Sequence, residues 1–313
     1  MSVILYRYDG SPFGAKVESM LALKSLPAAH VNVSPILPRP EIFELLGVGY
    51  RRIPVLAIGR DLYCDSSLIA SVLERRFPPS AGYGTLFPKR KDGGSVDTGL
   101  VKALAQFYAD SALFPTAVPL LSWDKVPAAF LSDRSKTLVE QQLSDGRQWL
   151  FDTETPGLAD LAVFFVLDWV RGFPGVGGEL FDKVKFGRTV EWLDNLSAHL
   201  KGLKASLPKP EKVSGKEAAA RIATASVETL AFDDKSRRAF PAFDETAAGL
   251  LGVKQGAVVS IVPEDNSRDY PTTGLLVGLN DEEYILEVKG EAGTCLCHFP
   301  RMRYAVVSKA AKL

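Results

Sequence analysis

Two short segments of the sequence place polar side chains where a strand passes into a helix. Ser11 follows the alternating residues 3–8 and precedes a helical pattern that begins near Pro12. Asp65 and Ser66 follow a predicted hairpin and open another helical pattern. Amides at a helix start can bind an anion, Ser66 can add a hydroxyl there, and Asp65 can pair with an ammonium group. These side chains therefore have the chemistry to contact a small ligand that carries both charges.

Pro54 begins the first strand of that hairpin. The apolar residues 55–58, the turn at Gly59 and the residues 61–64 predict two short strands. Proline lacks an amide donor, so it is tolerated at the first residue of a strand, and in a tight turn it can be cis. A cis bond here would leave the backbone of Ile53 free to pair with something other than the protein.

Helix capping is the plainer interpretation of the same polar residues. Serine and aspartate are common N-caps, and Pro12 directly after Ser11 suits the first helical position. Asp65 or Ser66 could cap the following helix in the same way. The residues alone leave both interpretations open, and one hydroxyl can serve both purposes.

The segments Ile53-Pro54 and Asp65-Ser66, with the hairpin between them, resemble the glutathione-binding half of the glutathione transferase family. In that family the residue before a cis-proline pairs its backbone with the cysteinyl part of glutathione. An acidic residue and a serine hold the γ-glutamyl end. The resemblance implies these roles for Ile53, Asp65 and Ser66, with glutathione as cosubstrate and no metal.

Ser11-Pro12-Phe13-Gly14 resembles the Cys-Pro-aromatic segment of omega-type transferases, with serine in place of cysteine, and aligns with a serine-rich segment of the zeta type. In serine-type members the hydroxyl favours the glutathione thiolate, which implies a catalytic role for Ser11. A serine cannot form a mixed disulfide, which argues against a thiol-disulfide oxidoreductase. The glutathione-binding residues that we expect are Ser11, Phe13, Arg39, Arg51, Ile53, Pro54, Asp65 and Ser66, with the two arginines near the glycyl carboxylate.

The remaining elements extend this resemblance to about residue 207. Strand, helix, strand, hairpin and helix over residues 1–80 give a thioredoxin-like order, and a Ser, Gly and Pro-rich linker follows up to about residue 95. Residues 96–207 read as an all-helical domain whose buried central helix follows Gly157, where the family has Ser or Thr. The resemblance implies an apolar substrate pocket in this domain. Tyr108, Phe114 and Trp123 are candidates to line it, although aromatic residues at helical spacing are more often core.

Residues 208–313 lie outside the resemblance to the transferase fold. Five short β-patterned runs between residues 258 and 308 predict a small antiparallel sheet or barrel, preceded by an Ala-rich helix over 214–224. We therefore expect an α/β plus all-α protein with an additional small α+β domain over 208–313. Such tails resemble those of fungal transferase-like proteins, which leaves their role open.

Composition limits the kinds of partner and the cellular compartment that we expect for the protein. The chain has 37 Lys and Arg against 37 Asp and Glu, so no global charge favours nucleic acid or a membrane surface. Its N-terminus does not resemble a secretory signal, and we expect a cytoplasmic protein. Cys64, Cys295 and Cys297 give no disulfide framework. Cys295-Leu296-Cys297-His298 could suggest a metal, but two thiols on one strand face, without a second ligand pair, favour buried core residues.

The resulting prediction is a glutathione-dependent transferase or isomerase that acts on a small apolar electrophile. The residues do not choose between conjugation and isomerisation. The alternative is a binding or regulatory protein that keeps the transferase scaffold without turnover. Homodimerisation is implied by the resemblance only.

Overall fold

The computed structural model describes residues 2–94, 96–118, 137–173, 181–226, 242–265 and 267–308. The chain divides into two compact units. Unit 1 contains residues 1–14, 27–76 and 209–313, and unit 2 contains residues 15–26 and 77–208. The predicted domain limits, at 80, 96 and 207, stay a prediction.

The N-terminal elements have the thioredoxin-like order that the sequence predicted. They are β1 (Val3–Arg7), α1 (Pro12–Leu23), β2 (Ala29–Asn32), α2 (Pro40–Leu46), β3 (Val55–Ile58), β4 (Asp61–Cys64) and α3 (Ser66–Arg76). Strand β1 pairs parallel with β2 and antiparallel with β3, which in turn pairs antiparallel with β4. All four residues of β3 and of β4 are buried, which explains the apolar character of β3.

The C-terminal part supplies two helices and five strands. These are α11 (Gly215–Thr224), α12 (Glu245–Leu251), β5 (Val258–Pro263), β6 (Thr272–Leu279), β7 (Glu283–Gly290), β8 (Gly293–Pro300) and β9 (Tyr304–Ser308). As expected, these strands pair antiparallel with one another. The expected sheet is not a separate one, however, because β8 pairs parallel with β4. One nine-stranded sheet results, in the order β2-β1-β3-β4-β8-β7-β6-β5-β9.

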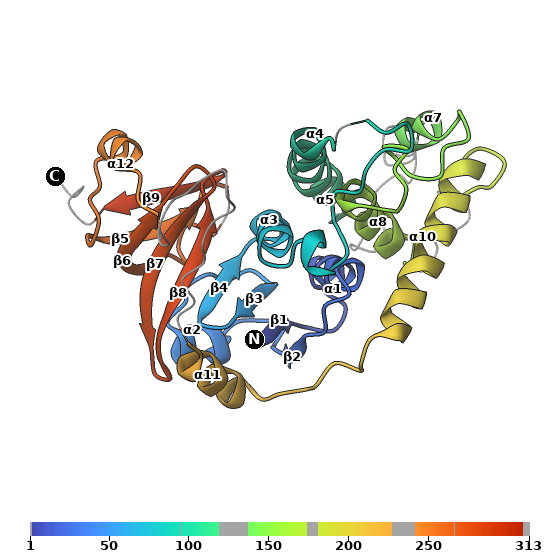
Figure 1. Ribbon diagram of the computed structural model, residues 1–313. Helices are drawn as coiled ribbons and strands as arrows, with labels where there is room; N and C mark the ends of the chain where they lie inside the picture. Colours follow the sequence, from blue (N-terminus) through green and yellow to red (C-terminus); the bar gives the residue numbers. More distant parts are fainter. Residues whose placement is uncertain are drawn as a thin grey trace. The chain divides into compact units, whose positions relative to one another are not determined.

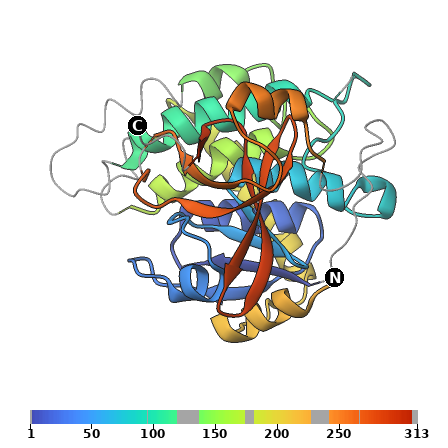
Figure 2. The ribbon, with the colours of Figure 1, turned by 90° about the vertical axis from the view of Figure 1, so that its left-hand side faces the viewer.

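The two halves of this sheet also share one hydrophobic core. It joins Ile4 and Val55 of the thioredoxin-like strands to Leu276, Leu286 and Phe299 of the C-terminal strands. The β7–β8 hairpin continues past the sheet toward α2 and α11, and Figures 1 and 2 show its tip beside them. The C-terminal strands are therefore part of the scaffold that carries the predicted site, a feature that the sequence pattern of 208–313 did not reveal.

Close backbone packing fixes the loop that leads into β3. Tyr50 N–H donates to Thr272 Oγ1 at 3.1 Å, directly after Gly49. A Cβ atom at Gly49 would lie 2.0 Å from the carbonyl oxygen of Pro271. Glycine is therefore required here by a close approach between two chain segments, and the start of β6 clamps the loop before Ile53.

Unit 2 is helical, as the sequence predicted. Its elements are η1 (Pro79–Ala81), α4 (Thr98–Ala103), the π-helical η2 (Leu104–Leu113), α5 (Phe114–Ala117), α7 (Thr137–Gln142), α8 (Leu158–Arg171) and α10 (Gly187–Ser206). Helix α8 is buried along nearly its whole length and is the expected central helix. Among the described residues, no helix is long and apolar enough to cross a membrane.

Candidate functional site

Ser11 lies at the N-terminus of α1, directly after β1. Its Oγ accepts a hydrogen bond from Gly14 N–H at 3.0 Å, and its own N–H donates to the Tyr8 carbonyl at 3.1 Å. This is the geometry of an N-cap, and the side chain is only 3% exposed. A hydroxyl that accepts one bond can still donate its proton. Capping and sulfur binding are therefore compatible at Ser11. Phe13, the second residue of α1, is half-buried.

The Ile53–Pro54 bond is cis, as the sequence predicted. Pro54 is buried directly before β3, and Ile53 is half-buried at the end of the loop that β6 clamps. The backbone of Ile53 and the N-terminus of α3 thus belong to one continuous piece of unit 1, joined by the β3–β4 hairpin.

Arg39 is occupied by the protein itself. Its Nε donates to the Ser34 carbonyl at 2.7 Å, its Nη2 to the Pro35 carbonyl at 3.0 Å, and its Nη1 to the Arg51 carbonyl. All three nitrogens therefore bind backbone carbonyls, and the side chain is buried. Arg39 ties the loop after β2 to the segment before Ile53.

Arg51 has a different environment. It is exposed, and its guanidinium lies 5.0 Å from the centre of the Tyr270 ring, in the connection between β5 and β6. This cation–π contact leaves the N–H donors of the guanidinium at its edge. Of the two predicted arginines, Arg51 is thus the one that can reach a ligand carboxylate.

Asp65 adopts a left-handed conformation, with φ of 78°, immediately before α3. Its Oδ1 accepts two hydrogen bonds from Ser67, from N–H at 2.9 Å and from Oγ–H at 2.7 Å. Asp65 is therefore the N-cap of α3, and the neighbouring Ser66 is buried. No cation forms an ion pair with the Asp65 carboxylate among the described residues, so its negative charge is available to a ligand.

Tyr304 is a site residue that the sequence did not reveal. It is the first residue of β9, and its hydroxyl donates to Asp65 Oδ2 at 3.0 Å. The same hydroxyl lies 3.1 Å from that of Tyr50, and the ring is 5.9 Å from the Phe299 ring. Burial, and then the Asp65 charge, raise the pKa of Tyr304, so its hydroxyl is a proton donor at neutral pH. No local motif marks this tyrosine, because the contact depends on how the whole sheet curls.

A buried charged network, also missed from sequence, lies where β4 meets β8. His298 is fully buried, with Nδ1 at 2.8 Å from Glu283 and Nε2 at 3.4 Å from Asp61. Arg75 pairs with Glu283 at 2.7 Å, and Arg76 pairs with Asp61 at 2.8 Å. Burial alone would lower the pKa of His298, but the Glu283 and Asp61 charges outweigh it and raise that pKa. His298 is thus held as a cation in an ionic network.

The cysteines beside His298 are packed thiols. Cys295 and Cys297 are buried, and Cys297 Sγ lies 3.8 Å from Cys64 Sγ on β4. Burial raises the pKa of the Cys297 thiol, which keeps it protonated and unreactive. This is the interpretation that the sequence favoured.

The predicted substrate-pocket residues lie in unit 2. Tyr108 is half-buried on the π-helical segment η2. Phe114 stacks on Phe165 and Trp169 of α8, with ring centres 6.0 and 5.6 Å apart. Trp123 lies outside the described residues. Phe114 therefore belongs to a half-buried aromatic cluster, and a role in substrate binding stays a prediction.

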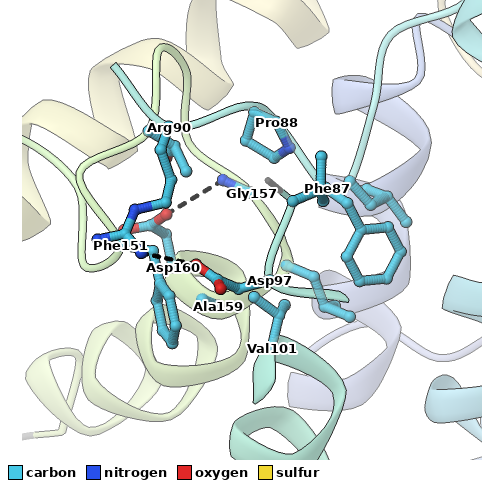
Figure 3. A pocket seen from close by; sticks show the side chains of 13 residues that line it. Phe87, Pro88, Arg90, Asp97, Val101, Phe151, Gly157, Ala159 and Asp160 are labelled. Carbon is cyan, nitrogen blue, oxygen red and sulfur yellow. Dashed lines mark hydrogen bonds and ion pairs between the residues drawn. The ribbon is translucent and has the colours of Figure 1, made fainter. Parts of the chain in front are cut away.

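A pocket lies at the N-terminus of α8 (Figure 3). Its walls include the Arg90–Asp97 ion pair, and neither Tyr108 nor Phe114 lines it. Gly157 N–H donates to Asp160 Oδ2 at 3.1 Å, which caps the helix. A Cβ atom at Gly157 would lie 2.6 Å from Pro88 Cδ. This explains the departure from the family's Ser or Thr, because Pro88 occupies the space that such a side chain needs.

The comparison with known families matches two segments of the chain. Residues 5–81 match the glutathione S-transferase N-terminal domain, and residues 124–204 match a domain of unknown function, DUF7962. Glutathione S-transferase U3 of Arabidopsis thaliana is 21% identical over 206 residues, which cover 64% of this chain and 87% of the plant protein.

Solved structures show where the C-terminal strands recur. A rice transferase solved in complex with glutathione has a TM-score of 0.53 at 21% identity, covering 71% of this chain and 94% of its own. A GST-like protein from Pseudomonas syringae has a TM-score of 0.76 at 27% identity, covering 98% of this chain and 99% of its own. The N-terminal domain match and this likeness over nearly the whole length show that the chain is similar to glutathione transferase-like proteins.

Proposed function

We propose that this protein binds glutathione and adds its thiolate to a small apolar electrophile, with Ser11 stabilising the thiolate as in serine-type transferases. The observation that carries the proposal is the Asp65 carboxylate. It is fixed at the start of α3 by Ser67 and Tyr304, yet no cation pairs with it within the described residues. A ligand ammonium group would complete that site.

Each part of glutathione has a counterpart in unit 1. The γ-glutamyl ammonium pairs with Asp65, and the neighbouring carboxylate binds at Ser66 and the N-terminus of α3. The cysteinyl backbone pairs with Ile53. The glycyl carboxylate binds the exposed Arg51, whereas Arg39 supports the loop because its nitrogens already bind backbone carbonyls.

Ser11 acts on the sulfur. A free thiol has a pKa of about 8.5, and a hydroxyl donor together with the N-terminus of α1 lowers that value. The thiolate lone pair then forms a carbon–sulfur bond, and the leaving group departs with its bonding electrons. With an unsaturated carbonyl substrate, addition followed by re-elimination of glutathione would isomerise a double bond. Tyr108 and Phe114 stay the candidates for contact with the electrophile.

A binding or regulatory protein without turnover is the second candidate. The burial of Ser11 and its hydrogen bond from Gly14 favour this alternative, because both are what a pure helix cap requires. Such a protein would bind glutathione through Asp65 and leave its thiol pKa unchanged.

A Ser11→Ala variant separates the two candidates. Ser214→Ala is the matched control, because Ser214 caps α11 by accepting from Glu217 N–H at 3.1 Å and lies outside the proposed site. The readouts are the pKa of bound glutathione, from thiolate absorbance, and the rate of conjugation to a chloronitrobenzene. Loss of a single donor to a developing anion typically costs on the order of 100-fold in rate.

We expect that loss in Ser11→Ala only, together with a return of the thiol pKa toward about 8.5. A full rate in Ser11→Ala would contradict the assigned mechanism. Wild-type protein that binds glutathione without accelerating any conjugation would establish the binding protein instead.

A further inference from the structure

We propose that Tyr304 of the C-terminal strands is a positioning residue for Asp65, and that these strands thereby complete the site for the γ-glutamyl end of the ligand. The inference rests on the proposed glutathione binding. It assigns to the C-terminal region a role in ligand recognition, beyond its place in the scaffold.

The hydrogen bonds of Asp65 within the described residues decide which of its two oxygens a ligand can bind. Each carboxylate oxygen has two acceptor sites. Both sites of Oδ1 are used by Ser67, through its N–H and its Oγ–H. Oδ2 accepts from Tyr304, which leaves one further site on that oxygen. A ligand ammonium must therefore bind Oδ2, the oxygen that Tyr304 holds in place.

The side chain of Tyr304 is itself fixed by packing. Its side chain is 3% exposed, and its ring contacts Phe299 and Tyr50, with ring centres 5.9 and 6.3 Å away. Tyr50 belongs to the loop before Ile53, so one residue of β9 contacts both the loop and Asp65. A donor that cannot turn away keeps the carboxylate in one orientation.

A second contact between the same segments supports this placement. Asp265, which follows β5, accepts a hydrogen bond from Arg52 and lies 3.4 Å from Arg303. Arg303 directly precedes Tyr304. Strand β9 is at the end of the sheet, four strands beyond β8, so only a strongly curled sheet can bring it to the residue after β4. The curvature of the C-terminal strands thus places Tyr304 in contact with Asp65.

The prediction is specific to the amino group of the ligand. Tyr304→Phe keeps the ring and removes only the hydroxyl that orients Oδ2. It should weaken the binding of glutathione, whose γ-glutamyl amino group needs Asp65. It should leave unchanged the binding of deamino-glutathione, in which a glutaryl group replaces the γ-glutamyl group.

Calorimetric titration of both ligands tests the proposal, with Tyr284→Phe as the matched control. Tyr284 is a buried tyrosine of β7 and is not part of the site. We expect Tyr304→Phe to bind glutathione about 5-fold to 20-fold more weakly. This is part of the roughly 10-fold to 150-fold that a hydrogen bond to a charged group is worth, because the Asp65 carboxylate itself is still present. Its affinity for deamino-glutathione, and both affinities of Tyr284→Phe, should stay within about 2-fold of wild type.

The outcomes separate the inference from the function on which it rests. Equal glutathione binding by wild type and Tyr304→Phe would overturn the role of Tyr304 and leave glutathione binding intact. If Tyr304→Phe bound both ligands more weakly by the same factor, the substitution would have distorted the whole site. That result would also overturn the role of Tyr304, even if the variant is less stable. Absence of glutathione binding in the wild type would remove the proposed function and this inference with it.

Discussion

Among the contacts that join the thioredoxin-like residues to the C-terminal strands, two that involve buried or half-buried carboxylates differ in how the negative charge is balanced. At His298, every buried carboxylate has cations beside it, because Asp61 and Glu283 contact His298 and also pair with Arg76 and Arg75. At Tyr304, the partner of Asp65 is a neutral hydroxyl. The first contact is complete without a ligand, whereas the second leaves a half-buried charge for one.

This difference distinguishes a structural ionic network from a binding site in one sheet. Both contacts join the thioredoxin-like residues to the C-terminal strands, so either could have been mistaken for the functional one. Charge balance separates them, since burying a charge without a partner is costly and His298 avoids that cost. Asp65 is placed where its charge can be balanced on binding.

His298→Ala should have the largest effect on stability. It leaves Asp61 and Glu283 buried beside each other without the cation between them. Removing one partner from a buried ionic network costs about 3–5 kcal/mol. Chemical denaturation measures this loss, with His199→Ala as control, because the half-buried His199 packs its ring against Trp149 and forms no ion pair within the described part of the chain. A loss below about 1 kcal/mol for His298→Ala, as for a surface pair, would contradict the structural role of the network.

The pH dependence of stability should show the same network. Burial would raise the pKa of Glu283, but His298 and Arg75 lower it from 4.5 to about 2. A carboxylate with a lowered pKa stabilises the fold above its ordinary value, so this contribution, on the order of 3 kcal/mol, is lost as pH falls from about 4.5 toward 2. His298 has a raised pKa, so its contribution is complete below 6.5 and is lost as pH rises through the folded value.

Denaturation across pH should therefore place the stability contributed by this network at a maximum between about pH 4.5 and 6.5. In Glu283→Gln the loss between about pH 4.5 and 2 should be smaller than in wild type. Identical acid profiles for the two proteins would show that Glu283 does not carry this dependence.

Gly49→Ala tests the packing of the loop that carries Tyr50, beside the contact between Tyr304 and Asp65. The new Cβ would lie 2.0 Å from the Pro271 carbonyl oxygen, so the loop before Ile53 must move. Overpacking of this kind costs about 1–3 kcal/mol. Gly99→Ala in α4 is the control, because nothing lies within 4 Å of its Cβ, and alanine there should stabilise by up to about 1 kcal/mol. Unchanged stability of Gly49→Ala would show that β6 does not clamp this loop.

Asp65→Asn should have the smallest effect on stability. Asparagine tolerates the left-handed conformation and its carbonyl can still accept from Ser67. We expect a change of less than about 1 kcal/mol in chemical denaturation, in contrast to His298→Ala. A loss as large as that of His298→Ala would mean that Asp65 is a structural residue like Asp61.

The sequence predicted most of the elements because local patterns determine them. Alternation, apolar runs and turn residues identified β1 to β4 and the five C-terminal strands. A continuous apolar run, together with the resemblance to the transferases, identified α8. The pairing of β8 with β4 could not be predicted, since register and strand order depend on contacts between residues 61–63 and 296–298. For the same reason the ionic network of His298 could not be predicted. The neighbouring Cys295 and Cys297 instead suggested a choice between a metal site and buried core thiols.

The candidate site also contains residues that local sequence patterns marked and residues that only the fold reveals. Ser11, Ile53, Asp65 and Ser66 follow from short motifs at the ends of strands and helices. Tyr304 lies 239 residues from Asp65 and reaches it through the curl of the sheet, so nothing near it in sequence marks it. The close approach of Pro88 to Gly157 is likewise visible only in the fold.

Calorimetric titration of glutathione into wild-type protein and into Asp65→Asn tests whether the Asp65 carboxylate binds the ammonium group of glutathione. We expect micromolar to millimolar binding by the wild type, weakened by about 10-fold or more in a variant of nearly unchanged stability, because a charged hydrogen bond is lost. Wild-type protein that does not bind glutathione, or a folded Asp65→Asn variant that binds it as tightly as wild type, would show that Asp65 does not have this role.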